Sequence, residues 1–485
     1  MGSLLPLLHI IGVIVGIFAF TMLIPLAFAW GGMDDARFAY DKALLITAGS
    51  GLALYLATRR FRRELQARDG FLLVTLVWTV LPAFATLPLL FYLPNMSFTD
   101  AYFETVSGLT TTGATVMTGL DALPRSINVW RCLLVLLGGM GIIVLAVAIL
   151  PLLGVGGSQI FRAETPGPMK DTKLTPRIAE TARGLWVVYF AISIVCFFAY
   201  AGAGMGWADA FMHMCSTMGL GGFSPYDASF GAFNSPAIEA VAIVFMLLAG
   251  VNFALYFMAW KRRSPAVLLR DIEARAYVAV LVASVFTVAL LLAHLGTYPD
   301  LQQSLRHAAF NVVSVATTTG YASVDYALWP PFAPVLMMLL CCFATSAGST
   351  GGGIKMIRAL LLVKQARREL VRIVHPHAVN PVRIGSTAVD NSVLFSVLAF
   401  MLVYGVTAIF MTLVLLLSGL DLVTAASAVM ACINNTGPGL GQVGPSGNYQ
   451  GLSDFQTWVC TATMLLGRLE LFSILVLFSP QFWRK

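Results

Sequence analysis

The stretch Ala-Thr-Thr-Thr-Gly-Tyr-Ala at residues 316–322 decides how this chain is organised, because shorter copies of it recur. Thr-Thr-Thr-Gly-Ala at 110–114 repeats it closely. Two looser copies are Gly-Leu-Gly-Gly-Phe at 219–223 and Asn-Asn-Thr-Gly-Pro at 434–438. The aligned glycines, Gly113, Gly222, Gly320 and Gly437, are between 98 and 117 residues apart. An internal period of this kind is typical of a chain built from repeated structural units.

The alignment extends upstream of the four glycines. The positions six residues earlier hold Ser107, Ser216, Ser314 and Ala431, and those nine residues earlier hold Glu104, His213, Asn311 and Ala428. The upstream segments 100–109, 209–218, 304–316 and 421–433 are long enough for a short helix but too short to cross a bilayer. We therefore predict a fourfold repeat in which a membrane span, a half-helix, a glycine segment and a second span follow one another.

Polar glycine segments at membrane depth have few uses, because irregular backbone survives there only inside protein or beside water. A cation filter needs a ring of backbone carbonyls that replace the ion's hydration shell. Glycine reaches the backbone torsions that turn carbonyls inward without steric cost. Ordinary loops between helices are the alternative, but four aligned copies favour one ring on a central axis.

The composition indicates a membrane protein. Of the 485 residues, 58% are hydrophobic and 11% are charged, and the mean hydropathy is +0.82. Apolar runs of 18 or more residues are dispersed along the chain and leave no room for a large soluble domain. The seven cysteines lack metal-ligand spacing and are expected to behave as small apolar residues.

The predicted fold is an all-α polytopic membrane protein with ten transmembrane helices. Two spans, 4–30 and 43–58, form an N-terminal two-helix domain at residues 1–69. Four pseudo-symmetric helix–pore-loop–helix repeats follow, and each contributes two spans. These pore repeats are repeat one at 70–153, repeat two at 184–260, repeat three at 277–363 and repeat four at 392–485.

Lysine and arginine are distributed unevenly between the connecting segments. Most of the 30 basic residues lie in the segments 59–68, 162–183, 261–275 and 355–383 and at the C-terminus. By the positive-inside rule these segments and both termini are cytoplasmic. A basic face toward anionic lipid explains the net charge of +7 without any nucleic acid. The four half-helices then enter from outside, and their C-terminal ends, which carry partial negative charge, favour a cation at the axis.

Several polar residues lie on the half-helices. Glu104, His213 and Asn311 are expected to support the filter from behind, and a proton site at His213 is the alternative. Asp100 and Asp209 begin their half-helices, where carboxylates are suited to cap the free N–H groups.

The second span of repeat three contains Ala-Gly-Ser-Thr-Gly-Gly-Gly at 347–353, followed by Lys355. So many glycines cannot hold a lipid-facing helix. We predict a broken helix whose intramembrane loop closes the pore below the filter, through Gly348, Ser349, Thr350, Gly351, Gly352, Gly353 and Lys355. A packing kink is one alternative. A nucleotide-binding loop is another, but the Gly-Lys-Ser/Thr order and a preceding strand are lacking.

Arg468 lies inside the last apolar span. A charge at that depth is costly and marks a candidate functional site. Glu470 is two residues further on, roughly on the opposite side of the helix, so a pair within the helix is not expected. Arg468 either faces the pore below the filter, where its charge is a barrier to K⁺, or forms an ion pair with another helix.

In combination, these features resemble the K⁺ transporter superfamily that includes the Trk, Ktr and HKT proteins, and most closely its TrkH-type subunits. The resemblance covers essentially the whole chain. It implies K⁺ uptake across the bacterial inner membrane, with K⁺ as the transported ion and no organic cofactor in this chain. It also implies a homodimer bound to a cytosolic TrkA-like RCK subunit that carries the regulatory nucleotide.

The resemblance also assigns a K⁺ selectivity filter. It comprises Thr111, Thr112 and Gly113; Leu220, Gly221 and Gly222; Thr318, Thr319 and Gly320; and Asn435, Thr436 and Gly437. The carbonyls of the first two residues in each set would hold K⁺. Only repeat three has a Gly-Tyr pair, and Leu220 and Asn435 interrupt the threonine pattern. Fewer ion sites and moderate selectivity over Na⁺ are therefore expected.

Two other functions remain as alternatives. The same architecture could couple K⁺ to H⁺ or Na⁺, with His213 or Arg468 involved. A membrane-embedded enzyme would need converging nucleophilic, basic or metal-binding groups, and the few ionisable residues in the spans do not supply them. The sequence therefore favours a passive, channel-like transporter.

Overall fold

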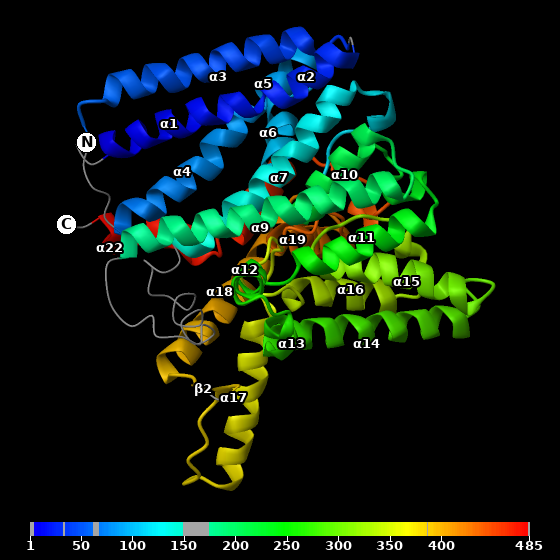
Figure 1. Ribbon diagram of the computed structural model, residues 1–485. Helices are drawn as coiled ribbons and strands as arrows, with labels where there is room; N and C mark the ends of the chain where they lie inside the picture. Colours follow the sequence, from blue (N-terminus) through cyan, green and yellow to red (C-terminus); the bar gives the residue numbers. More distant parts are fainter. Residues whose placement is uncertain (1–3, 33, 62–66, 149–173, 386, 484–485) are drawn as a thin grey trace.

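The computed structural model describes residues 4–32, 34–61, 67–148, 174–385 and 387–483, and these are predominantly helical (Figure 1). Strands β1 (Arg383–Ile384) and β2 (Thr387–Ala388) form a small antiparallel hairpin. Parts of the predicted cytoplasmic segments 59–68 and 162–183 lie outside the described residues, as do residues 149–153 of repeat one and the last two residues of repeat four.

Several helices are long and apolar enough to cross a membrane. Among the described residues they are Leu5–Gly32, Asp69–Tyr92, Ala182–Gly202, Ile272–His294 and Asn391–Leu417. Two further pairs of helices pass the same test when each is taken as one bent span. The remaining three predicted spans correspond to α3 (Arg37–Thr58), α7 (Arg125–Ala148) and α16 (Phe332–Phe343). The chain is an all-α polytopic membrane protein, as predicted.

The N-terminal helices lie together along one side of the molecule (Figure 1). They are α1 (Leu5–Thr21), α2 (Leu23–Gly32) and α3. Helices α1 and α3 approach closely through Gly12 and Gly51, where an added Cβ would collide with the backbone of the other helix. Small residues permit this close packing of helices in lipid. Helix α3 has 22 residues and is longer than the predicted span 43–58.

The four repeats share one order of elements. Their first helices are α4 (Ala67–Ala85) with α5 (Leu87–Tyr92), α9 (Leu174–Gly202), α14 (Ile272–His294) and α18 (Asn391–Leu417). Their half-helices are α6 (Phe98–Leu109), α10 (Trp207–Gly219), α15 (Leu301–Ala316) and α19 (Leu422–Ile433). Their second helices are α7, α11 (Pro236–Ala249) with α12 (Phe253–Arg262), α16 with α17 (Met356–Val374), and α20 (Asp454–Arg468) with α21 (Phe472–Leu475).

Three of these second helices are interrupted. The predicted break in repeat three is present between α16 and α17. The second spans of repeats two and four, expected at 238–260 and 455–478, are each bent, since α11 and α12 meet at 86° and α20 bends by 103° into residues 472–478. Glu470 and Leu471, in the second break, both have positive φ. Beyond its break, α17 extends away from the rest of the molecule together with the β-hairpin (Figure 1).

The helix caps differ in part from the prediction. Ser97 caps α6 by accepting a hydrogen bond from the backbone N–H of Asp100, so Asp100 lies in the first turn and is not the N-cap. Gly206 is the N-cap of α10, and Asp209 instead accepts from the Tyr226 hydroxyl. Asp421 does cap its half-helix, since its carboxylate accepts from the Thr424 N–H at 3.0 Å.

Candidate functional site

All four half-helices end in the same hydrogen-bonded turn. The residue just before each aligned glycine donates its backbone N–H to the carbonyl of the residue five positions earlier in the chain. In repeat one, for example, Thr112 donates to Ser107, and the four distances are 2.8, 3.0, 2.8 and 2.8 Å in repeats one to four. The residue two positions before each aligned glycine donates its backbone N–H to the carbonyl of the residue three positions earlier, at 2.9, 3.2, 3.0 and 3.2 Å in repeats one to four. This pair of bonds is a Schellman motif, which needs a left-handed residue just after the helix. Thr111, Leu220, Thr318 and Asn435 occupy that position, with φ of 54°, 54°, 61° and 54°.

Left-handed torsions recur two residues later, at the aligned glycines. Gly113, Gly222, Gly320 and Gly437 have φ of 80°, 63°, 85° and 95°. The residue between the two left-handed positions has negative φ in each repeat, so the backbone hand alternates along the segment. Alternation turns successive carbonyls toward one side, as a filter of backbone oxygens requires. Left-handed threonine is strained, so the surrounding packing must hold these segments in place.

The four glycine segments interlock in chain order. A Cβ added to any aligned glycine would meet the carbonyl oxygen of the residue just before the next repeat's glycine. These pairs are Gly113 with Gly221, Gly222 with Thr319, Gly320 with Thr436, and Gly437 with Thr112. Because the fourth segment closes on the first, the segments form a ring. One cavity, on the side of the ring where the chain continues after the glycines, is lined by all four glycines, together with Thr115, Arg131 and Ser224.

Side-chain bonds hold the ring unevenly. The hydroxyls of Thr110 and Thr112 lie 2.7 Å apart in repeat one, and those of Thr317 and Thr319 lie 2.7 Å apart in repeat three. In repeat four, Asn435 Nδ2 donates to Thr112 Oγ1 of the neighbouring segment, in repeat one, at 3.0 Å. Repeat two has Leu220 between two glycines and therefore no side chain that could make an equivalent bond.

The intramembrane loop, residues 344–355 between α16 and α17, packs against the ends of the half-helices. The Gly352 N–H donates to Thr318 Oγ1 at 2.9 Å, and Thr350 Oγ1 donates to the Met218 carbonyl at 3.0 Å. Lys355 Nζ donates to the Gly351 carbonyl within the loop. A Cβ on Gly352 would collide with the Asn434 carbonyl, so the close approach to repeat four requires glycine there.

Arg468 binds this loop through backbone carbonyls. Its Nη1 donates to the Thr350 carbonyl at 3.0 Å, and its Nη2 donates to the Gly138 carbonyl of α7 at 2.9 Å. Its side chain is 2% exposed. The ion-pair alternative is wrong for the part of the chain that the structure describes, because Arg468 has no carboxylate partner there. Glu470 pairs instead with Arg358 of α17, at 2.6 Å.

Comparison with known proteins identifies this architecture. A sequence model of the family described as "Cation transport protein" and named TrkH matches residues 36–485. The chain belongs to the TrkH family of cation transport proteins. It is a transport protein and not an enzyme.

The relatives of this TrkH-family chain match over nearly its full length. It is 45% identical over 484 residues, all of both chains, to the Trk system potassium uptake protein TrkH of Halomonas elongata. It is 44% identical over 478 residues to the protein of the same name from Escherichia coli K12, covering 98% of this chain and 99% of the relative. The crystal structure of the potassium transporter TrkH from Vibrio parahaemolyticus matches with a TM-score of 0.92 and 41% identity, covering 99% of both chains.

In three repeats, the polar residue nine positions before the aligned glycine bonds to the segment that follows that glycine. The Glu104 carboxylate accepts the Val116 N–H at 3.1 Å, and Asn311 Oδ1 accepts the Ser323 N–H at 3.2 Å. A ring nitrogen of His213 lies 3.3 Å from the Ser224 hydroxyl. Repeat four has alanine here, and the adjacent Ser427 makes the bond by accepting the Leu440 N–H at 2.8 Å.

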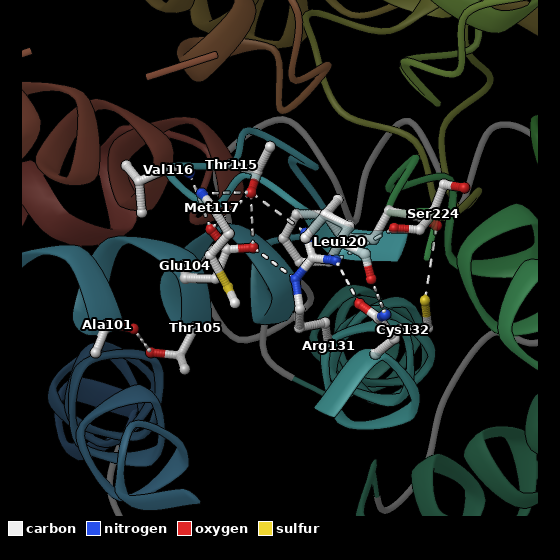
Figure 2. Close-up of polar contacts among 12 residues, drawn as sticks. Ala101, Glu104, Thr105, Thr115, Val116, Met117, Leu120, Arg131, Cys132 and Ser224 are labelled. Carbon is white, nitrogen blue, oxygen red and sulfur yellow. Dashed lines mark hydrogen bonds and ion pairs between the residues drawn. The ribbon is translucent and has the colours of Figure 1, made fainter. Parts of the chain in front are cut away.

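Arg131 is a site residue that the sequence analysis missed. It lies on α7, is 1% exposed, and its Nε donates to Glu104 Oε1 at 2.8 Å (Figure 2). An arginine within the apolar run Val-Trp-Arg-Cys-Leu carries the same signal that identified Arg468 and could have been found from it.

Proposed function

We propose that this TrkH-family chain takes up K⁺ across the bacterial inner membrane through one pathway, with the ring of glycine segments as its selectivity filter. The interlocked ring supports the proposal, because the carbonyl before each aligned glycine lies against the aligned glycine of the neighbouring repeat. Such carbonyls replace the hydration shell of a dehydrated monovalent cation. The contributing carbonyls are those of Thr111, Thr112, Leu220, Gly221, Thr318, Thr319, Asn435 and Thr436. The names of the relatives support K⁺ as the ion.

The half-helices contribute an electrostatic preference for cations. Helices α6, α10, α15 and α19 all end at the ring, so the partial negative charge of each C-terminus is directed toward it. Their Schellman turns use only some of the terminal carbonyls. The same geometry disfavours an anion.

The intramembrane loop is the proposed gate. Arg468 pins it by donating to Thr350 on one side while binding Gly138 of α7 on the other. Release of the loop opens the path below the ring. Control of this release by a cytosolic RCK-type subunit that binds a nucleotide, on the basic inner face of a homodimer with cytoplasmic termini, completes the proposal.

Flux through purified protein in liposomes tests the proposed function. Under opposed gradients of K⁺ and Na⁺, the reversal potential should follow K⁺, with Rb⁺ close to K⁺. It should not move when a pH gradient is imposed, because a passive pathway couples to no second ion. A reversal potential that tracks the pH or Na⁺ gradient would instead establish the coupled symporter, and no K⁺ current would refute both.

A further inference from the structure

The supports behind the ring are neutral in three repeats and charged in one. Repeats two, three and four use His213, Asn311 and Ser427, and each of these bonds to the exit segment of its own repeat. The exit segment is defined here as the two or three residues after each aligned glycine. Repeat one uses Glu104, whose carboxylate also binds the guanidinium of Arg131. A charged pair at 1% exposure costs several kcal/mol in desolvation, so a neutral pair would be the cheaper support.

The side chain of Arg131 joins repeats one and two by hydrogen bonds to both of their exit segments. Its Nη2 donates to Thr115 Oγ1 in the exit segment of repeat one, at 3.3 Å. Its Nη1 donates to the Ser224 carbonyl in the exit segment of repeat two, at 3.2 Å. The guanidinium also lies over the Phe223 ring, with 4.4 Å to the ring centroid. Figure 2 shows Arg131 between Glu104 and Ser224, with Thr115 beside the carboxylate.

Repeat two is the part of the ring that most needs an external support. Its segment Gly219-Leu220-Gly221-Gly222 has three glycines and no hydroxyl pair of the kind found in repeats one and three. Glycine loses the most conformational freedom on ordering, so this segment is the least constrained by its own sequence. From α7, Cys132 Sγ adds a weak bond to the Phe223 carbonyl at 3.7 Å.

We propose that Arg131 is a positioning residue that sets ion selectivity, by fixing the exit segment of repeat two against that of repeat one. Glu104 holds the guanidinium in place and neutralises its charge. This rests on the proposed function, since selectivity has meaning only for a cation filter. The geometry of a filter discriminates between K⁺ and Na⁺ only while its carbonyls keep their spacing and number.

The charges of Arg131 and Glu104 predict a second effect, on how readily a cation enters the cavity, that can be measured separately from selectivity. Arg131 lines the cavity that the four glycines also line. With Glu104 ionised, the pair presents no net charge to an arriving cation. Without that carboxylate, one positive charge remains at the cavity, where it repels K⁺.

The test uses Arg131→Lys, Arg131→Gln and Glu104→Gln in the full-length protein in liposomes. Lysine keeps the charge but cannot bind carboxylate, hydroxyl and carbonyl in one plane. Both Arg131 variants should raise the Na⁺-to-K⁺ permeability ratio about fivefold, because coupled contacts of this kind are worth about 1 kcal/mol. Glu104→Gln should raise the KM for K⁺ about threefold at low salt, and the increase should shrink at high salt.

The matched control is Arg306→Gln. Arg306 pairs with Glu239 at 2.7 Å between repeats two and three, and it does not line the cavity. Its loss should leave the permeability ratio unchanged. Arg131→Lys that conducts with wild-type selectivity would overturn the inference, as would an equal loss of selectivity in Arg306→Gln. Wild-type protein without K⁺ selectivity would instead refute the proposed function.

Discussion

The ring of glycine segments and the intramembrane loop touch one another, yet they are built in opposite ways. The ring consists of four copies of one backbone conformation, each made by a Schellman turn and an aligned glycine. The loop occurs only in repeat three, and its contacts with Thr318, Met218 and Arg468 have no counterpart elsewhere in the described residues.

The difference separates two kinds of constraint. The ring is defined by main-chain atoms, so a side chain such as Leu220 can replace threonine while φ stays at 54°. The aligned glycines resist replacement, because each has positive φ and leaves no room for a Cβ. The loop is held in part by the individual side chains of Thr350, Arg468 and Glu273, so single substitutions can loosen it. Repetition thus suits a fixed ion site, and a unique set of contacts suits a part that moves.

Replacing an aligned glycine is expected to have the largest effect. In Gly320→Ala, the new Cβ would collide with the Thr436 carbonyl and would force a left-handed torsion on alanine. The ring must then shift, and one of the carbonyl oxygens that we propose as K⁺ ligands is displaced. K⁺ flux in liposomes should fall by about a hundredfold or more, as when a preorganised oxygen is displaced by 1 Å.

Gly419→Ala separates the collision from backbone strain. Gly419 has φ of 95°, and nothing lies within 4 Å of its added Cβ. This variant should lose about 1 kcal/mol of stability from strain alone, with wild-type flux. Equal losses of flux in the two variants would mean that the ring has no special role.

Releasing the loop is expected to have the second largest effect, in the opposite direction. Arg468→Ala removes the charge-assisted hydrogen bond that holds the loop at the Thr350 carbonyl, which is worth about 1.5 kcal/mol or more. A shift of 1.4 kcal/mol is a factor of about ten in an equilibrium, so K⁺ flux should rise about tenfold without any partner protein. Single-channel recording or liposome flux measures the rise.

Arg468→Lys distinguishes pinning from a charge barrier. Lysine keeps the positive charge, but its ammonium is a compact point charge without the guanidinium fork that spans two carbonyls. Pinning predicts that lysine conducts like alanine. A lysine variant with wild-type flux would show that the charge itself limits K⁺, and that the bonds to Thr350 and Gly138 do not.

Much of this organisation could be predicted from the sequence, because repeats and apolar runs are read directly from residue order. The four aligned glycines correctly predicted four half-helices, and the apolar runs correctly predicted where the membrane spans lie. The glycine-rich stretch 347–353 also correctly predicted a broken helix. These features depend on local composition and on spacing, which a single sequence contains.

The rest depends on partners that are distant in the chain. At the break between α11 and α12, the Tyr277 hydroxyl packs against Gly250 where a Cβ would otherwise lie. Arg468 Nη2 donates to the carbonyl of Gly138, which is 330 residues away in the chain. The partners of Arg131, Glu104 on α6 and Ser224 after the second aligned glycine, are 27 and 93 residues away. Hydropathy and spacing carry no information on such contacts.

The smallest expected effect concerns the ends of the loop. Glu273, at the start of α14, accepts the N–H groups of Ala347 and Ile357 on one carboxylate oxygen, at 2.8 and 3.0 Å. Glu273→Gln keeps an acceptor oxygen but loses the charge, which should weaken the pair by about 1 kcal/mol. If both ends must loosen for the loop to move, K⁺ flux should rise by about threefold in the absence of a partner.

Asp271→Asn is the matched control for that variant. Asp271 caps the same helix by accepting the Ala274 N–H at 2.7 Å, and asparagine caps equally well. It loses the same charge two residues away without a hydrogen bond to the loop, so its flux should stay at the wild-type level. A rise in both variants would assign the effect to the local charge. A rise in Glu273→Gln alone would show that the loop, unlike the ring, is set by individual side chains at its ends.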